Sequence, residues 1–299
     1  MMDSPALVAR PVADSLDELL GGAHRQSFVP ADARSPAGFE RVEIDGERCV
    51  VKYVHPDLDF TMRVSGDLGC RPRRVWEAGL MDLAPDTIDH AVLGVARWGR
   101  NGWGAALLMR DVSDDLPVLG DEPIDEELHA AFLDGIAALA TPLWDFQGDV
   151  GLLPHRLRWA WFGPDQLAGE ERLGFPEAVP RIATEGWQRF AARTPGDVLR
   201  AVEALRRDPL PLSEALQSTP QTFVHGDWKI GNLGYAADKW SCSTGHIRAR
   251  VRSAMSWRGI SRSTGRGSRS ATPRNRRSRI SALRSSGTAS PLRAGGIAN

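Results

Sequence analysis

The composition of the chain changes abruptly near residue 240, and this change limits which part can form a packed domain. Residues 1–240 carry 24 basic and 38 acidic residues, a net charge of −14. Residues 241–299 carry 13 Arg and no acid, a net charge of +13, and only 7 of these 59 residues are Leu, Ile, Val or Phe. A segment so poor in apolar residues does not bury enough surface to offset the entropy of ordering it. We therefore predict a globular part ending near Trp240 and an Arg/Ser-rich tail over 241–299.

The remaining composition bounds the class of protein. At 42% hydrophobic residues over 299 positions, the chain can bury a core. No apolar run approaches the roughly 20 residues of a membrane span, and the first ten residues lack the pattern of a secretory signal. The cysteines, Cys49, Cys70 and Cys242, are too widely spaced for a zinc motif or a disulfide framework. These features predict a cytoplasmic protein without a membrane partner.

The first part of the chain has the pattern of a small sheet with one helix. The expected elements are strands over 39–44, 49–54, 91–98 and 104–109 and a helix over 73–81. Asp45-Gly46 is a favourable hairpin turn between the first two strands. We assign residues 30–110 to a small lobe and residues 1–29, with a short helix over 14–20, to an N-terminal extension.

After residue 110 the pattern becomes helical. Amphipathic segments predict helices over 125–140, 180–192 and 197–207. Residues 111–240 are therefore assigned to a helical lobe, which ends where the composition changes. The fold class predicted from these patterns is α+β.

One short motif carries the chemistry. An apolar strand, Thr222-Phe223-Val224, runs into His225-Gly226-Asp227, and Asn232 follows Asp227 at a spacing of five. Phosphoryl transfer needs a carboxylate that accepts the acceptor's hydroxyl proton and a nearby oxygen ligand for Mg²⁺. Asp227 and Asn232 supply both in this order. The plainer alternative for Asp227 and Asn232 is a turn, in which Asp and Asn are common. In either case we expect His225 to brace the loop by hydrogen bonds rather than to take part in the chemistry.

This motif resembles the catalytic loop of the aminoglycoside phosphotransferase/choline kinase-like family, distant relatives of protein kinases. The resemblance covers roughly residues 30–240. It implies a protein-kinase-like two-lobe fold, with a small antiparallel sheet lobe and a helical lobe. It also implies ATP and Mg²⁺ as cofactors and a small-molecule hydroxyl acceptor such as an antibiotic, choline, a sugar or an amino alcohol.

The same resemblance assigns roles to individual residues. Asp227 is the expected catalytic base, Asn232 a metal ligand, and Lys229 a charge that reaches the transferred phosphate. Lys52 matches the nucleotide-phosphate lysine of the third strand, and Glu77 on the following helix is its expected partner. The alternative for both lysines is a solvent-facing position. Residues 35–38 are a weaker expectation for a nucleotide loop, and 107–111 for the inter-lobe hinge.

The family carries a second metal-binding Asp on the strand after this loop, and this chain has no Asp or Glu after Asp238. The genetic code offers an explanation. One allowed coding of residues 240–247 is TGG TCC TGC TCG ACT GGG CAT ATC. Read from the third base of the Trp240 codon, it gives Val-Leu-Leu-Asp-Trp-Ala-Tyr, an apolar strand followed by Asp-Trp. We therefore predict a frameshift that disrupts the C-terminal part and impairs activity.

A different reading explains the tail without a frameshift. Arg-rich segments bind the phosphates of nucleic acids, so the chain could be a non-catalytic protein whose basic tail binds nucleic acid. This alternative accounts for the charge but not for the interruption of the domain. The DNA sequence around codon 240 would separate the two.

Overall fold

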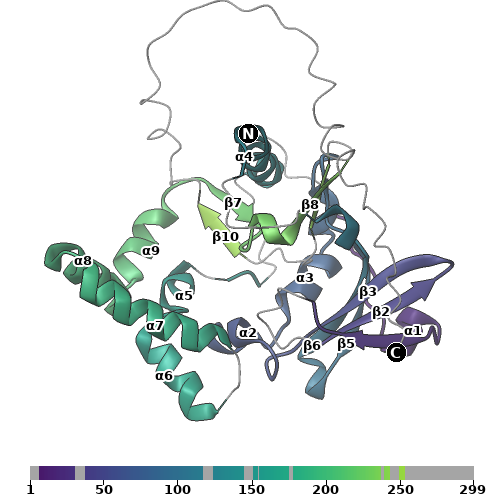
Figure 1. The fold of residues 1–299 in the computed structure, drawn as a ribbon, viewed down its shortest axis with the longest axis horizontal. Helices are drawn as coiled ribbons and strands as arrows, with labels where there is room; N and C mark the ends of the chain where they lie inside the picture. The colour runs from purple at the N-terminus through teal and green to yellow at the C-terminus, as the bar shows by residue number, and fades with distance from the viewer. Residues whose placement is uncertain are drawn as a thin grey trace, which may run out of the picture. The chain divides into compact units, whose positions relative to one another are not determined.

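The computed structural model describes residues 7–30, 38–116, 124–144, 151–153, 155–174, 178–236, 239–242 and 249–252. The chain divides into the units Met1–Met255 and Ser256–Asn299, and every element below belongs to the first. This unit combines an antiparallel sheet with several helices (Figure 1). The predicted mixture of α and β elements is thus confirmed. Its division into two lobes stays a prediction.

A five-stranded antiparallel sheet has the strand order β1-β2-β3-β6-β5. Its strands are β1 (Arg25–Phe28), β2 (Phe39–Ile44), β3 (Glu47–Val54), β5 (Val92–Trp98) and β6 (Gly104–Arg110). The predicted turn joins β2 to β3. Its two residues, Asp45 (φ 53°) and Gly46 (φ 81°), both take the left-handed conformation that a two-residue hairpin favours.

The two faces of this sheet pack against different helices. One face packs against Trp76 of α3 (Arg71–Glu77), and the other against Leu20 of α1 (Leu16–Leu20). Lys52 on β3 is paired with Leu107 on β6, and Leu107 belongs to the core under α3. Directly paired residues of neighbouring strands lie on the same face. The Lys52 side chain therefore projects from the α3 face of the sheet.

The segment predicted as an N-terminal extension is part of the sheet domain. It supplies α1 and the edge strand β1. Ahead of α1, an N-terminal strap (residues 8–13) crosses the end of α3. The Trp76 indole donates to the Pro11 carbonyl at 2.8 Å, and the Arg10 amide donates to the Glu77 carbonyl at 3.0 Å. The predicted boundary between residues 29 and 30 therefore does not separate two structural parts.

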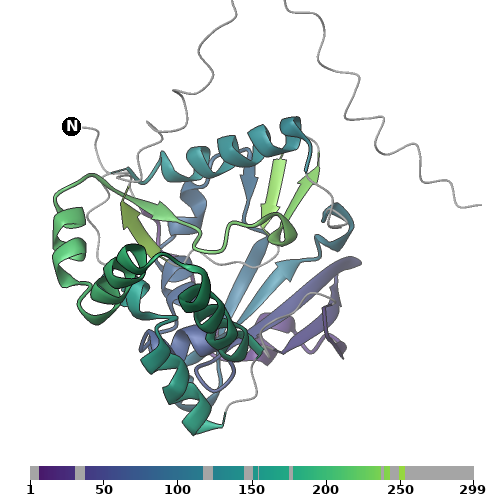
Figure 2. The ribbon, with the colours of Figure 1, turned by 60° about the vertical axis from the view of Figure 1, so that its left-hand side comes forward.

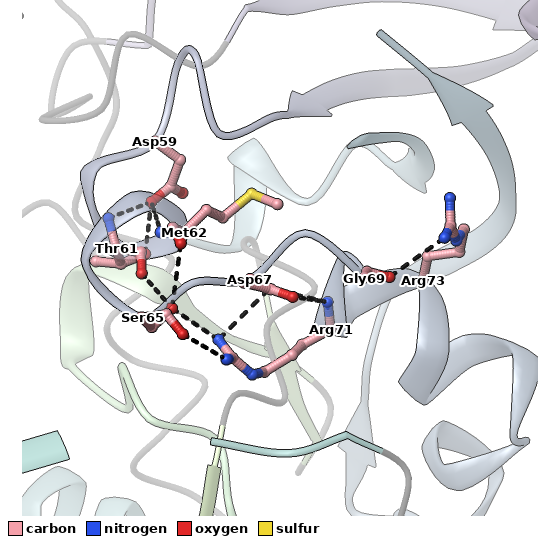
Figure 3. A network of polar contacts seen from close by, with 8 residues as sticks. All are labelled: Asp59, Thr61, Met62, Ser65, Asp67, Gly69, Arg71 and Arg73. Atoms are coloured by element: carbon pink, nitrogen blue, oxygen red, sulfur yellow. Dashed lines mark hydrogen bonds and ion pairs between the residues drawn. The ribbon is translucent and has the colours of Figure 1, made fainter. Parts of the chain in front are cut away.

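Buried polar side chains fix the turn between α2 (Phe60–Val64) and α3 (Figure 3). Asp59 caps α2 by accepting a hydrogen bond from the Thr61 amide at 2.7 Å. Asp67 accepts one from the Arg71 amide at 2.9 Å, and the Arg71 guanidinium donates to the Ser65 hydroxyl at 2.9 Å. These contacts set where α3 begins.

The same helix ends earlier than the sequence pattern predicts. The expected helix runs to residue 81, but α3 ends at Glu77. Gly79 takes a positive φ of 68°, which interrupts the helix, and the short 3₁₀ turn η1 (Leu80–Leu83) follows. Two further 3₁₀ turns, η2 (Arg100–Gly102) and η3 (Ser113–Asp115), flank β6.

Helices dominate the described chain between residues 126 and 217. They are α4 (Glu126–Ala140), α5 (His155–Ala160), α6 (Pro164–Leu173), α7 (Ala178–Arg193), α8 (Gly196–Arg207) and α9 (Leu210–Gln217). The predictions that correspond to α4, α7 and α8 are confirmed. The prediction lacks α5, α6 and α9, although Pro164 at the first turn of α6 is a start signal. Within the described ranges, no helix is both long enough and apolar enough to cross a bilayer.

Two short sheets surround the His225-Gly226-Asp227 motif. β7 (Gln221–Val224) pairs antiparallel with β10 (Ala249–Arg252). β8 (Leu233–Ala236) and β9 (Lys239–Cys242) form a hairpin, and β9 also pairs in parallel with β4 (Ile88–Asp89). Figure 2 shows α4 lying across this hairpin, as their shared apolar cluster requires. Because β9 crosses residue 240 and β10 lies beyond it, the predicted tail contributes to two of the strands.

Candidate active site

The motif loop starts where β7 ends, and a glycine makes its first turn. Gly226 has a φ of 81°, a backbone conformation that residues with a side chain rarely adopt. His225, only 2% exposed, accepts a hydrogen bond on Nδ1 from the Asp227 amide at 3.3 Å. The interpretation of His225 as a brace of the loop is thereby confirmed.

Asp227 and Asn232 meet in the structure. Asn232 Nδ2 donates to the Asp227 carboxylate oxygen Oδ2 at 2.9 Å and to the Asp227 carbonyl at 3.1 Å. The short 3₁₀ turn η4 (Ile230–Asn232) brings them together, with the Asn232 amide bonded to the Lys229 carbonyl at 2.9 Å. Asn232 is buried, whereas Asp227 is half-buried. One carboxylate oxygen is therefore oriented from within the protein while the group keeps contact with solvent.

Two tryptophans tie this loop to α4. The Trp228 indole donates to the Phe132 carbonyl at 3.1 Å, and the Trp240 indole to the Ala131 carbonyl at 3.2 Å. Gly135 lies beneath both rings. The sequence analysis does not include this contact, because it depends on how α4 packs.

Of the two predicted lysines, Lys229 is exposed on the loop and its role stays a prediction. Lys52 is only 6% exposed, and its Nζ lies 5.7 Å from the centre of the Phe39 ring. The expectation of a lysine on the wet face of the hairpin is therefore wrong for Lys52. Its burial on the α3 face is compatible with the predicted nucleotide role.

Glu77, the predicted partner of Lys52, lies in an exposed position at the end of α3. Across the described ranges, the ion pairs do not include one between Glu77 and Lys52. The N-terminal strap holds this end of α3, since the Glu77 carbonyl accepts a hydrogen bond from the Arg10 amide. The pairing of Lys52 with Glu77 stays a prediction.

Most of the predicted hinge, residues 107–111, lies inside a strand of the five-stranded sheet. Residues 107–110 lie inside β6, where they pair with β3 and β5, and Leu107 is fully buried. The connection out of the sheet therefore begins at Asp111. Residues 35–37 of the predicted nucleotide loop and residues 243–248, where the second Asp is expected, lie outside the described residues.

A charged pair links the five-stranded sheet to β4. Arg110 at the end of β6 donates to the Asp89 carboxylate. Burial alone would raise the pKa of Asp89, but the hydrogen bonds from Arg110 and from the Ala91 amide, together with the positive charge of Arg110, lower that pKa overall. Next to it, burial lowers the pKa of His90, whose ring lies edge-on to Trp76 at 6.4 Å. Because β4 pairs with β9, this link joins the sheet of Lys52 to the hairpin that follows Asn232.

A scan against protein-family models and a search of curated proteins both find no match for this chain. Solved structures that match include thermostable mutants of aminoglycoside phosphotransferase APH(4)-Ia. Two are ternary complexes with hygromycin B, one with ADP and one with AMP-PNP, and a third is the apo form. Their identities are 13–15% and their TM-scores 0.36–0.39, over 79% of this chain and 68–71% of theirs. At these values the likeness carries no functional conclusion.

Proposed function

We propose that this chain descends from an ATP-dependent phosphotransferase that acts on the hydroxyl group of a small molecule. The observation that carries the proposal is the 2.9 Å contact between Asn232 and the Asp227 carboxylate at the end of β7. A carboxylate oriented in this way, half-buried on a short loop, is suited to accept a proton from a bound hydroxyl. The burial of Lys52 on the α3 face supports a second cation for the nucleotide phosphates.

In the proposed reaction, Asp227 accepts the proton of the acceptor hydroxyl. The acceptor oxygen bonds to the γ-phosphorus of ATP while the bond to the β-phosphate oxygen breaks, and ADP leaves. Asn232 orients the carboxylate through Oδ2, and Oδ1 receives the proton. Lys229 and Lys52 offset negative charge on the phosphates.

The residues present offer the type of ligand that Mg²⁺ prefers but too few of them. Mg²⁺ prefers oxygen ligands, and the amide oxygen of Asn232 would provide one while Asp227 serves as the base. Within the described ranges, however, no group of three or more His, Cys, Asp or Glu side chains is placed to bind a metal. The chain also has no acid after Asp238. We therefore propose that Mg²⁺ dependence belongs to the form with the restored reading frame and that this chain is impaired in transfer.

The test compares this chain with a version whose frame is restored after Trp240. Transfer of phosphate from labelled ATP is measured with a panel of hydroxyl-bearing antibiotics, amino alcohols and sugars. The restored protein should transfer phosphate, and Asp227→Asn should reduce its turnover by ~10²–10⁴ with the fold retained. Asp197→Asn on α8, an exposed acid outside the loop, is the matched control and should leave turnover unchanged. Full turnover in Asp227→Asn would disprove the assignment.

The net charge of +13 over residues 241–299 keeps the second candidate function open. A nucleic-acid-binding tail would show affinity that falls steeply with salt, since each phosphate contact releases counterions. Equal phosphate transfer by this chain and the restored one, or strong salt-dependent binding by this chain, would favour a functional tail over a frameshift.

A further inference from the structure

The indoles of Trp228 and Trp240, which both bond to α4, lie on either side of Asn232 in the sequence. Trp228 directly follows Asp227 in the chain, and Trp240 lies on β9, beyond Asn232. Both donate to carbonyls of consecutive residues, Phe132 at 3.1 Å and Ala131 at 3.2 Å. A carbonyl inside a helix has a second lone pair, so these bonds form without breaking the helix. Two separate points of the loop region are thus attached to one turn of α4.

The packing around these bonds leaves little room for the rings to shift. The centres of the Trp228 and Trp240 rings are 6.2 Å apart, and both rings contact Phe132 at 5.9 and 6.2 Å. A Cβ at Gly135 would lie 2.9 Å from Trp228 and 3.0 Å from Trp240. Trp240 is 3% exposed. The rings are therefore fixed by contacts on several sides as well as by their N–H groups.

These anchors determine where the Asp227 carboxylate lies. On one side, the His225 ring packs edge-on against Trp228 at 5.8 Å while its Nδ1 accepts from the Asp227 amide. On the other side, Asn232 holds the carboxylate, and the neighbouring Leu233 is fully buried in the cluster that contains Trp240. The chain on both sides of Asp227 is therefore held, through Trp228 and Trp240, against α4.

We propose that Trp228 and Trp240 are positioning residues, whose indole N–H groups hold Asp227 in place through α4. The proposal rests on the proposed function only for its catalytic consequence. Trp240 is the last residue before the composition changes, so this attachment is complete within the unaltered sequence. This chain therefore keeps an assembled Asp227–Asn232 loop, and its impairment comes from the missing metal carboxylate rather than from a displaced base.

The first test uses the protein as it exists and does not depend on activity. Amide hydrogen exchange of residues 225–234 is measured in the full chain and in Trp228→Phe and Trp240→Phe, which keep an aromatic ring but lose the donor. Loss of one such bond should raise local exchange about five-fold. Trp187→Phe on α7 is the matched control, because that indole also donates to a carbonyl, that of Phe162. It should leave exchange over 225–234 unchanged.

The second test separates positioning from simple stability. In the frame-restored enzyme, Trp228→Phe and Trp240→Phe should each lower kcat at least about ten-fold. The KM for ATP should stay within two-fold, because the base and not the nucleotide is displaced. Trp187→Phe should keep kcat. Unchanged exchange over 225–234, or faster exchange with kcat intact, would overturn the proposal. If no protein transfers phosphate, the proposed function fails, and the exchange measurement alone decides whether α4 holds the loop.

Discussion

The contact between α4 and the two indoles predicts that adding one methyl group at Gly135 overpacks this contact. In Gly135→Ala, the new Cβ would lie 2.9 Å from Trp228 Cζ2 and 3.0 Å from Trp240 Cδ1. Carbon atoms pack best at about 3.5–4.0 Å, so each ring or the helix must retreat by roughly half an ångström. The indole hydrogen bonds to Phe132 and Ala131 resist that retreat.

The magnitude is the difference between two effects. Overpacking a tight contact costs about 1–3 kcal/mol, whereas replacing Gly by Ala inside a helix contributes about 1 kcal/mol of stability. Gly135→Ala should therefore lower the free energy of unfolding by about 0–2 kcal/mol. Gly186 on α7 has no atom within 4 Å of the position of a Cβ, so Gly186→Ala should show the helix gain alone. The difference between the two variants isolates the packing cost.

Urea unfolding followed by tryptophan fluorescence measures both variants against the parent chain. With a typical slope of about 2 kcal/mol per molar urea, a difference of about 2 kcal/mol separates the two midpoints by roughly 1 M. If Gly135→Ala proves as stabilising as Gly186→Ala, the indoles do not pack on α4 as described.

Three further predictions concern other parts of the molecule. Removal of residues 1–14 deletes the N-terminal strap with its four hydrogen bonds to α3 and β5, and should lower the free energy of unfolding by about 2–6 kcal/mol at ~0.5–1.5 kcal/mol per bond. Removal of residues 1–6 alone is the control, and equal urea midpoints for both truncations would contradict the role of the strap. Burial lowers the pKa of His90, so as pH falls below about 6.5 the unfolded chain takes up a proton before the folded chain does, and the free energy of unfolding should decrease. Urea midpoints from pH 8 to 5 should show a smaller decrease in His90→Gln. Limited trypsin digestion should remove the Arg-rich tail to a limit beyond Arg252 rather than after Lys239, because β10 pairs with β7. Mass spectrometry of the fragment identifies the cut, and a fragment that ends at Lys239 would contradict this pairing.

The elements that sequence predicted well are those with a local signal. The alternation of residues 39–44 and 49–54, with Asp45-Gly46 between them, defines a hairpin without help from the rest of the chain. The same holds for the Asp227–Asn232 pair, since a spacing of five across one 3₁₀ turn lets the two side chains meet. In these cases the structure depends on interactions between residues that are close in the sequence.

The failures arise where distant parts decide the outcome. The predicted helix over 73–81 ends early at Glu77, because Gly79 interrupts it and the N-terminal strap, more than sixty residues earlier, holds that end of α3. The attachment of Trp228 to α4 likewise joins residues 96 positions apart. No periodicity in the sequence encodes which carbonyl an indole will reach. β1 has no alternation of burial and is a strand only because β2 lies beside it.

The parallel pairing of β4 with β9 has a consequence for how the protein is made. Ile88 pairs with Trp240, 152 residues later in the chain. At about 5–20 residues per second, a ribosome needs roughly 8–30 s to deliver the second strand after the first. During this interval the β4 edge of the nascent chain has no β9 to pair with, and unpaired strand edges expose incomplete chains to aggregation. Any translation product that stops before Trp240 lacks the pairing with Ile88, and an altered message beyond that codon changes Ser241 and Cys242, the second half of the closing strand.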